Sequence, residues 1–222
     1  MEVCPSMPLP TIVSLVSTIN RLSFFYKYFQ IDIGDGIFVS NRTVQISDII
    51  KHCQEFKNLS SLTFDFHLMV KDYVSDIEKI NQLERLVKIK NVFIHFGAVD
   101  DFSHELDKLS SIPIGLTLNP EDRVSDLADK MNLDKIPCLQ IMSVVPGVQG
   151  NPFIEKTLIK IEQLRHLGYR NKIYLDGAVN NKTMPIINSL RYKPDVVCPG
   201  SFLVKSPDND LKNRVDYLLK FK

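Results

Sequence analysis

The stretch that decides the fold is residues 138–178, CLQIMSVVPGVQGNPFIEKTLIKIEQLRHLGYRNKIYLDGA. Two short apolar runs, 138–142 and 173–175, have the length of buried strands. Between them, apolar residues recur at helical spacing at Ile154, Leu158, Ile161 and Leu164. We expect Asn151 to cap this helix, Pro152 to occupy its first position and Gly168 to end it. Strand, helix and strand in this order predict a parallel βαβ unit.

The same alternation extends along the rest of the chain. Further apolar runs of strand length lie at 11–15, 29–33, 62–68, 92–95, 114–118 and 196–198. Two more amphipathic stripes are Val74, Ile77, Ile80, Leu83 and Val87, and then Leu211, Val215 and Leu218 after Ser206-Pro207. Eight strands alternating with helices predict an α/β protein, a (β/α)₈ TIM barrel, with an open doubly wound sheet as the alternative. The 222 residues suit one barrel domain spanning 1–222.

Composition excludes several classes of function. The net charge is +1, with 44% hydrophobic and 24% charged residues, so we expect neither nucleic acid nor a membrane as partner. The four cysteines have no zinc-type spacing and fit buried thiols in a reducing compartment. We see no secretory signal pattern and no apolar run of about 18 residues, and we therefore expect a cytoplasmic protein.

Polar side chains interrupt three of the predicted strands near their carboxyl ends, where barrels of this kind place their active sites. Side chains of a strand alternate in direction, so Gln30 and Asp32 share a face that we expect to point into the barrel. His67 and Met69 share the inward face of the next strand, and Asp176 ends a later one. The side chains of Gln30, Asp32, His67 and Asp176 could together bind a divalent metal. Each alone also fits a helix cap, a turn or a buried core residue.

Glycine-containing loops follow the last three predicted strands. They are residues 145–150, Asp176-Gly177-Ala178 and Pro199-Gly200-Ser201. Glycine lets backbone N–H groups approach an anion closely, and the last loops of such barrels commonly bind phosphate. The alternative is that these glycines only form turns.

Six short segments resemble the motifs of the ribulose-phosphate 3-epimerase family. Residues 31–39, IDIGDGIFV, resemble HxDxMDGxFV, and residues 65–70, DFHLMV, resemble DxHLMV. Residues 142–150, MSVVPGVQG, resemble MTVxPGFGGQ, and residues 175–180, LDGAVN, resemble VDGGxN. Gly200-Ser201 matches the terminal GS, and Pro10-Thr11-Ile12-Val13 resembles the opening PSIL.

This resemblance implies a barrel of the ribulose-phosphate-binding type and an isomerase of carbohydrate metabolism in the pentose phosphate pathway. It implies interconversion of D-ribulose 5-phosphate and D-xylulose 5-phosphate at carbon 3 through an enediolate, with Asp32 and Asp176 as the two catalytic carboxylates. It also implies one divalent metal ion, Zn, Fe, Mn or Mg, held by Asp32, His67, Asp176 and, by position, Gln30. The substrate-binding residues implied are Thr11, His67, Met69, Met142, Gly147, Val148, Gln149, Gly150, Gly177, Ala178, Gly200 and Ser201. The family further suggests a homo-oligomer, a dimer or a hexamer.

The chain departs from the family pattern at several of these positions. Gln30 stands where the motif has its first metal-ligating His, Gly34 replaces a Met, and Ala178 replaces a Gly. Gly97 stands where a Glu usually follows His95, and Gln149 adds bulk to the loop after the sixth strand. Two alternatives therefore stay open, a catalytically impaired sugar-phosphate-binding barrel and an epimerase acting on another ketose phosphate. A phosphosugar decarboxylase or lyase is disfavoured, because no DxKxxD arrangement and no strand-end lysine stands out.

Overall fold

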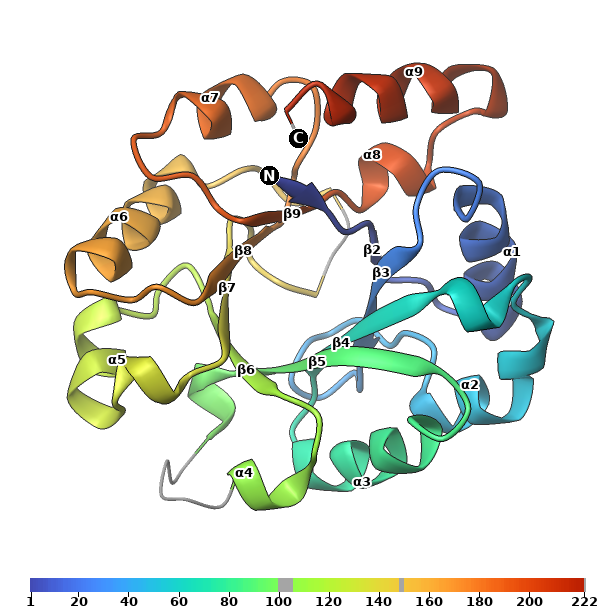
Figure 1. Ribbon diagram of the computed structural model, residues 1–222, viewed down its shortest axis with the longest axis horizontal. Helices are drawn as coiled ribbons and strands as arrows, with labels where there is room; N and C mark the ends of the chain where they lie inside the picture. Colours follow the sequence, from blue (N-terminus) through green and yellow to red (C-terminus); the bar gives the residue numbers. More distant parts are fainter. Residues whose placement is uncertain (100–105, 148–149, 222) are drawn as a thin grey trace.

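The computed structural model describes residues 1–99, 106–147 and 150–221, and all the strands in this part of the chain form one parallel sheet. In Figure 1 the helices surround the strands. The strands are β1 (Glu2–Val3), β2 (Ser6–Met7), β3 (Tyr28–Gly34), β4 (Thr63–Met69), β5 (Lys88–His95), β6 (Ile114–Leu118), β7 (Cys138–Met142), β8 (Lys172–Asp176) and β9 (Val196–Cys198).

The amino-terminal segment closes this sheet into a barrel. β1 pairs with the last strand, Glu2 opposite Val196, and β2 pairs with β3, Ser6 opposite Gln30. The residues between β1 and β2 continue the strand pairing, because the N–H of Cys4 donates to the carbonyl of Val197 at 3.0 Å. Residues 2–7 therefore serve as one interrupted strand, and the fold is a (β/α)₈ TIM barrel.

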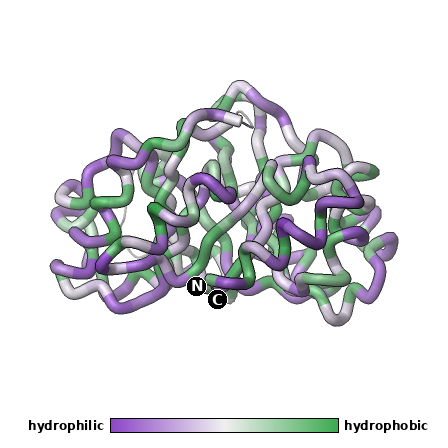
Figure 2. The backbone as a smooth tube through the Cα atoms, turned by 90° about the horizontal axis from the view of Figure 1, so that it is seen from above, coloured by the Kyte–Doolittle hydropathy of each residue, from purple (hydrophilic) through white to green (hydrophobic). Residues whose placement is uncertain are grey.

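Helices cover the outside of the barrel, and the aliphatic faces of the strands pack beneath them. Ile31 and Ile33 of β3 are completely buried in the same core as Ile77 and Ile80. The helices are α1 (Ile12–Leu22), α2 (Ile46–His52), α3 (Tyr73–Leu83), α4 (Leu106–Leu109), α5 (Val124–Lys130), α6 (Ile159–His166), α7 (Met184–Ser189), α8 (Ser201–Val204) and α9 (Asp208–Leu219). Short 3₁₀ turns lie at Cys53–Glu55, Leu59–Ser61, Phe96–Ala98, Leu133–Lys135 and Glu155–Leu158. Figure 2 shows hydrophobic stretches in the middle of the molecule and the two termini side by side.

Seven of the eight predicted strands are confirmed, with ends that differ by at most four residues from those predicted, but the first is wrong. Residues 11–15 begin α1, with Thr11 as its N-cap, whose Oγ1 accepts from the N–H of Ser14 at 3.2 Å. Helical spacing of the buried Leu15, Val16, Ile19 and Leu22 outweighs the short apolar run. The strand that is present was not recognisable, because Pro5 interrupts it and neither half exceeds two residues.

The predicted helix punctuation is confirmed only in part. Gly168 has a φ of +92° directly after α6, as expected of a residue that ends a helix. Asn151 caps no helix, because α6 begins only at Ile159 and the Asn151 amide donates instead to the carbonyl of Val145 at 2.7 Å. Among the described residues, no helix combines the length and the apolar character needed to cross a bilayer.

The predicted stripe of the last helix is buried, and no side chain caps the start of this helix. Leu211, Val215 and Leu218 of α9 all lie in the core. Pro207 occupies the N-cap position without a side-chain hydrogen bond, since the Ser206 hydroxyl donates to the Pro207 carbonyl.

Candidate active site

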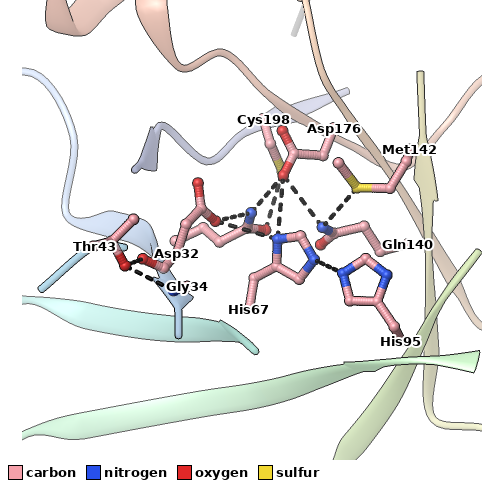
Figure 3. A network of polar contacts seen from close by, with 10 residues as sticks. Asp32, Gly34, Thr43, His67, His95, Gln140, Met142, Asp176 and Cys198 are labelled. Atoms are coloured by element: carbon pink, nitrogen blue, oxygen red, sulfur yellow. Dashed lines mark hydrogen bonds and ion pairs between the residues drawn. The ribbon is translucent and has the colours of Figure 1, made fainter. Parts of the chain in front are cut away.

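Three strands bring two carboxylates and an imidazole together at the carboxyl end of the barrel (Figure 3). Asp32 of β3 and His67 of β4 are register partners, and Asp176 ends β8. His67 Nδ1 lies 3.3 Å from Asp32 Oδ1 and 3.7 Å from Asp176 Oδ2. One potential ligand atom from each of the three residues lies within 4.8 Å of the others. All three side chains are almost completely buried, so the group forms a compact acidic centre.

Gln30 points into the barrel as predicted and joins the two carboxylates. Its Nε2 donates to Asp32 Oδ1 at 2.8 Å and to Asp176 Oδ2 at 2.6 Å. Its Oε1 faces the thiol of Cys198 at 3.5 Å. The amide nitrogen, and not the oxygen, therefore faces the acidic centre in this structure.

The protonation of Asp176 is shifted by its surroundings. Burial raises the pKa of Asp176, and the neighbouring charge of Asp32 raises it further. The proximity of His67 and the hydrogen bond from Gln30 act in the opposite direction. Gln140 of β7, which the sequence analysis did not single out, also donates to Asp176 Oδ2, at 3.2 Å. Asp176 is thus a carboxyl group able to hold a proton near neutral pH.

A second imidazole lies directly behind the first. His95, the last residue of β5, is completely buried, and its Nε2 is 2.9 Å from Nε2 of His67. The two rings stack with centroids 4.9 Å apart. Burial lowers the pKa of His95 well below its ordinary value, and the proximity of His67 lowers it further. His95 is therefore a neutral hydrogen-bonding partner of His67.

The loop after β3 folds back over the end of that strand. Thr43 Oγ1 donates to the Asp32 carbonyl at 2.7 Å and accepts from the Gly34 N–H at 2.8 Å. A Cβ atom on Gly34 would lie only 2.6 Å from the carbonyl oxygen of Asn41. This close passage explains why glycine stands at position 34, and it fixes the backbone that carries Asp32.

A cavity of about 190 Å³ opens above the acidic centre. Most of the residues that the sequence analysis assigned to substrate binding line it: His67, Met69, Met142, Gly147, Gly150, Gly177, Ala178, Gly200 and Ser201. Asp32 and Asp176 also line it, whereas Gln30 lies behind them. The predictions for Val148 and Gln149 fall outside the described residues.

The glycine loops at one side of the cavity adopt backbone conformations that side chains disfavour. Gly147, Gly150 and Gly177 have φ values of +102°, +100° and +113°. Gly147 also packs closely on Val39, because a Cβ atom there would lie 2.8 Å from the Val39 Cβ. Ala178 has a φ of +49° although it is not glycine. These residues form compact turns with backbone exposed toward the cavity, which suits an anion.

Thr11 is the one described residue of the predicted substrate set that does not line the cavity. It is exposed at the start of α1, where its hydroxyl serves as a helix cap. Ser6 of β2 lines the cavity instead and is 3% exposed. The signal that could have located it is Pro5-Ser6, which fits the opening Pro-Ser pair of the family motif better than Pro10-Thr11.

A closed parallel barrel with a buried pair of carboxylates below a glycine-lined cavity has the architecture of an enzyme with its active site at the carboxyl ends of the strands. A model of the "Ribulose-phosphate 3 epimerase family" matches residues 3–201. The chain belongs to this family and is an isomerase.

Curated relatives agree with this assignment, and a solved structure agrees with the fold. The ribulose-phosphate 3-epimerase of Helicobacter pylori is 28% identical over 218 residues, covering 95% of this chain and 94% of its own. That of Encephalitozoon cuniculi is 30% identical over 177 residues, covering 78% of this chain and 74% of its own. A mutant tryptophan synthase α-subunit of Pyrococcus furiosus superimposes with a TM-score of 0.68 at 14% identity, covering 99% of this chain and 97% of its own. At that identity the likeness concerns the fold alone.

Proposed function

We propose that this chain interconverts D-ribulose 5-phosphate and D-xylulose 5-phosphate by inverting carbon 3. The observation that carries the proposal is the pair of buried carboxylates, Asp32 and Asp176, facing one another across His67 at the floor of the cavity. Inversion needs a base on one face of the carbon and an acid on the other, and two opposed carboxyl groups supply both.

The two carboxyl groups divide the proton transfers between them. We assign Asp32, as the carboxylate, to remove the proton from carbon 3, which lies next to the ketone, so that the electron pair forms an enediolate. Asp176, whose pKa is raised, starts protonated and gives its proton to the opposite face of carbon 3. In the reverse reaction the roles exchange. Met69 and Met142 line the cavity beside this centre and would present polarisable sulfur to the reacting carbon.

The glycine loops suit the phosphate end of the substrate. The backbone at Gly147, Gly150, Gly177 and Ala178 turns with positive φ beside the cavity, and Gly200-Ser201 lines it where the chain passes from β9 to α8. N–H groups in such turns can surround phosphate oxygens without side-chain charge. Val148 and Gln149 remain predicted members of this site.

The donor set also fits one divalent metal ion, Zn, Fe, Mn or Mg. Asp32, His67 and Asp176 would hold it, since each offers one ligand atom within 4.8 Å of the others. When bound, such an ion acts as a Lewis acid for the oxygens next to the reacting carbon. Gln30 could join as a fourth ligand only after its amide rotates to exchange Oε1 for Nε2, because Nε2 now faces both carboxylates.

The orientation of Gln30 also favours a second candidate, a sugar-phosphate-binding barrel with impaired catalysis. An amide that already satisfies both carboxylates competes with a metal ion for them. An epimerase acting on another ketose phosphate uses the same centre and differs only in the substrate carbons beyond it. Assembly into a dimer or hexamer stays a prediction, to be checked by analytical ultracentrifugation.

Exchange of a substrate hydrogen with solvent deuterium tests the proposal. Ribulose 5-phosphate incubated with the protein in D₂O should gain deuterium at carbon 3 and yield xylulose 5-phosphate, both measured by NMR. Asp32→Asn and Asp176→Asn should abolish the exchange, whereas Asp129→Asn, at an exposed carboxylate, should not. Tight binding of the sugar phosphate without exchange would establish the impaired binder, and exchange confined to another ketose phosphate would reassign the substrate.

A further inference from the structure

A second depression in the surface adjoins the cavity at its glycine loops. It is an open groove of about 660 Å³, and Gly150, Asn180 and Ser201 line both the groove and the cavity. Its other walls come from α8, from α9 and from the segment between β8 and α7, and Figure 1 shows α8 beside α9. The groove therefore begins where the phosphate end of the substrate is proposed to lie.

The groove carries a net positive charge. Among the described residues, the charged side chains that line it are Lys182, Lys205, Arg214 and Asp210. Asp210 neutralises Arg214, whose Nε donates to Asp210 Oδ2 at 2.6 Å and whose Nη1 donates to the carbonyl of Phe202 at 2.8 Å. Lys182 and Lys205 are exposed, and in the described part of the chain their ammonium groups have neither a carboxylate nor a hydrogen-bond partner. Two positive charges therefore remain for a ligand.

Both lysines leave the backbone close to residues that line the cavity. The N–H of Lys182 donates to Oδ1 of Asn180 at 2.8 Å, and the N–H of Lys205 donates to the carbonyl of Ser201 at 3.1 Å. Asn180 and Ser201 are two of the residues that the groove and the cavity share. Each lysine thus has a backbone anchored on the phosphate side of the cavity, while its long side chain remains free to follow an anion.

The cavity alone presents an unfavourable charge to a phosphate group. Among the residues that the structure describes, no lysine or arginine lines it, whereas Asp32 and Asp176 do. A phosphate monoester carries a charge of about −1.5 to −2 at pH 7, so ionised carboxyl groups in the same cavity repel it. The net charge of the chain is only +1 and gives no general attraction. Two unpaired cations beside the glycine loops oppose this repulsion.

We propose that Lys182 and Lys205 recruit the phosphate group of the substrate through this groove and balance its charge beside the cavity. The inference deepens the proposed function and rests on its placement of the phosphate at the glycine loops. There the backbone N–H groups fix the position of the phosphate, and the two lysines supply the charge that favours a phosphorylated sugar over a neutral one. Both lysines are substrate-binding residues that act away from the reacting carbon.

Removing both charges tests the inference in the epimerisation of ribulose 5-phosphate. Lys182→Gln combined with Lys205→Gln should raise KM and lower kcat/KM about tenfold at low ionic strength. Salt screens exposed charges, so this difference should shrink to about twofold in about 0.5 M salt. Lys182→Arg combined with Lys205→Arg keeps both charges and should restore KM. The matched control is Lys51→Gln combined with Lys57→Gln, which removes two exposed charges at and after the end of α2, near the amino ends of the strands.

Binding of inorganic phosphate gives a second readout that does not depend on activity. In a ³¹P NMR titration with a chelator present, phosphate should bind the double Gln variant at Lys182 and Lys205 about five- to tenfold more weakly than the unsubstituted protein. The control variant should bind it as the unsubstituted protein does.

Three outcomes would overturn the inference. Equal phosphate affinity and equal KM in the unsubstituted protein and the double Gln variant would do so and would leave the proposed reaction standing. An equal loss in the control variant would assign the effect to the overall charge of the protein. Absence of phosphate binding by the unsubstituted protein would remove the phosphate end of the proposed function as well, while deuterium exchange at carbon 3 would still decide the reaction.

Discussion

Replacing Gln30 by Leu should destabilise the metal-free protein and make its stability more dependent on pH. Leu has a similar volume but removes the two N–H donors that serve Asp32 and Asp176 at 2.8 and 2.6 Å. Both carboxylates stay buried after the change. The substitution therefore leaves two acceptors without their shared donor rather than removing the whole network.

The expected loss of stability in Gln30→Leu can be compared with that of the same substitution at a second buried glutamine, Gln140. Each buried acceptor left without its partner costs about 1–3 kcal/mol, so Gln30→Leu should lower the free energy of unfolding by about 3 kcal/mol after the gain from apolar packing. In a chain of this length that corresponds to a fall in Tm of about 6–12 °C. Gln140→Leu should cost about 1 kcal/mol or less. Gln140 makes one longer bond to Asp176, at 3.2 Å, and its own oxygen is buried without a partner among the described residues.

The pH dependence follows from Asp176. Its pKa in the folded protein is already raised, and the bond from Gln30 is one of the interactions that lower it. Without that bond the pKa should rise further. A carboxyl group with a raised folded pKa loses stability as pH rises from its unfolded value toward its folded value. The difference between the variant and the unsubstituted protein should therefore be larger at pH 8 than at pH 5.

Urea unfolding in the presence of a chelator, followed by circular dichroism at both pH values, measures these differences. Gln82→Leu, at an exposed position of α3, controls for the loss of an amide. If Gln30→Leu were as harmless as that control, or if Gln140→Leu cost more, the amide would not be what satisfies the two carboxylates.

Three further predictions concern stability and binding. Burial raises the pKa of Asp65 to about 7. The unsubstituted protein should therefore lose up to about 4 kcal/mol of stability between pH 4 and pH 8 through this group. In urea unfolding, Asp65→Asn should reduce this loss of stability with pH, and an unchanged pH dependence would contradict the burial argument. Ala178→Gly should raise Tm by about 1–4 °C in calorimetry because it relieves a φ of +49°, and a lower Tm would show that the turn is not strained. Ser6→Ala should raise the KM for ribulose 5-phosphate about tenfold at unchanged Tm, consistent with loss of one hydrogen bond. Thr11→Ala should instead cost about 1 kcal/mol of stability, because a helix cap is lost, and should leave KM unchanged. The reverse pattern would restore Thr11 to the substrate site.

The inward or outward direction of side chains on a long strand could be predicted from the sequence. Period-two alternation placed Gln30 and Asp32 inside and Ile31 outside, and the structure agrees, because Ile31 lies in the outer core and Gln30 bonds to both carboxylates. The order of the strands around a barrel then brought Asp176 to the same end.

Contacts that depend on pairing across strands could not be predicted. β1 and β2 have two residues each, too few for any periodicity, so Ser6 carried no strand signal. His95 and Gln140 are single polar residues in apolar runs, and only the pairing of β4 with β5 and of β7 with β8 brings them beside His67 and Asp176. The Gln30 amide donates to both carboxylates and accepts from the thiol of Cys198, a residue 168 positions away.

The split amino-terminal strand has a consequence for how the molecule folds. Its first half pairs only with β9 and its second half with β3, and the amino group of Met1 donates to the carbonyl of Phe221, 220 positions away, at 3.1 Å. During synthesis β2 can join β3 early, whereas β1 must wait for the last strand to emerge. Until then the growing sheet has two unpaired edges, which are the templates for aggregation that a finished cylinder lacks. The pairing of β1 with β9 joins residues from almost opposite ends of the chain. The entropy of closing so long a loop is expected to make this pairing a slow and late step of folding.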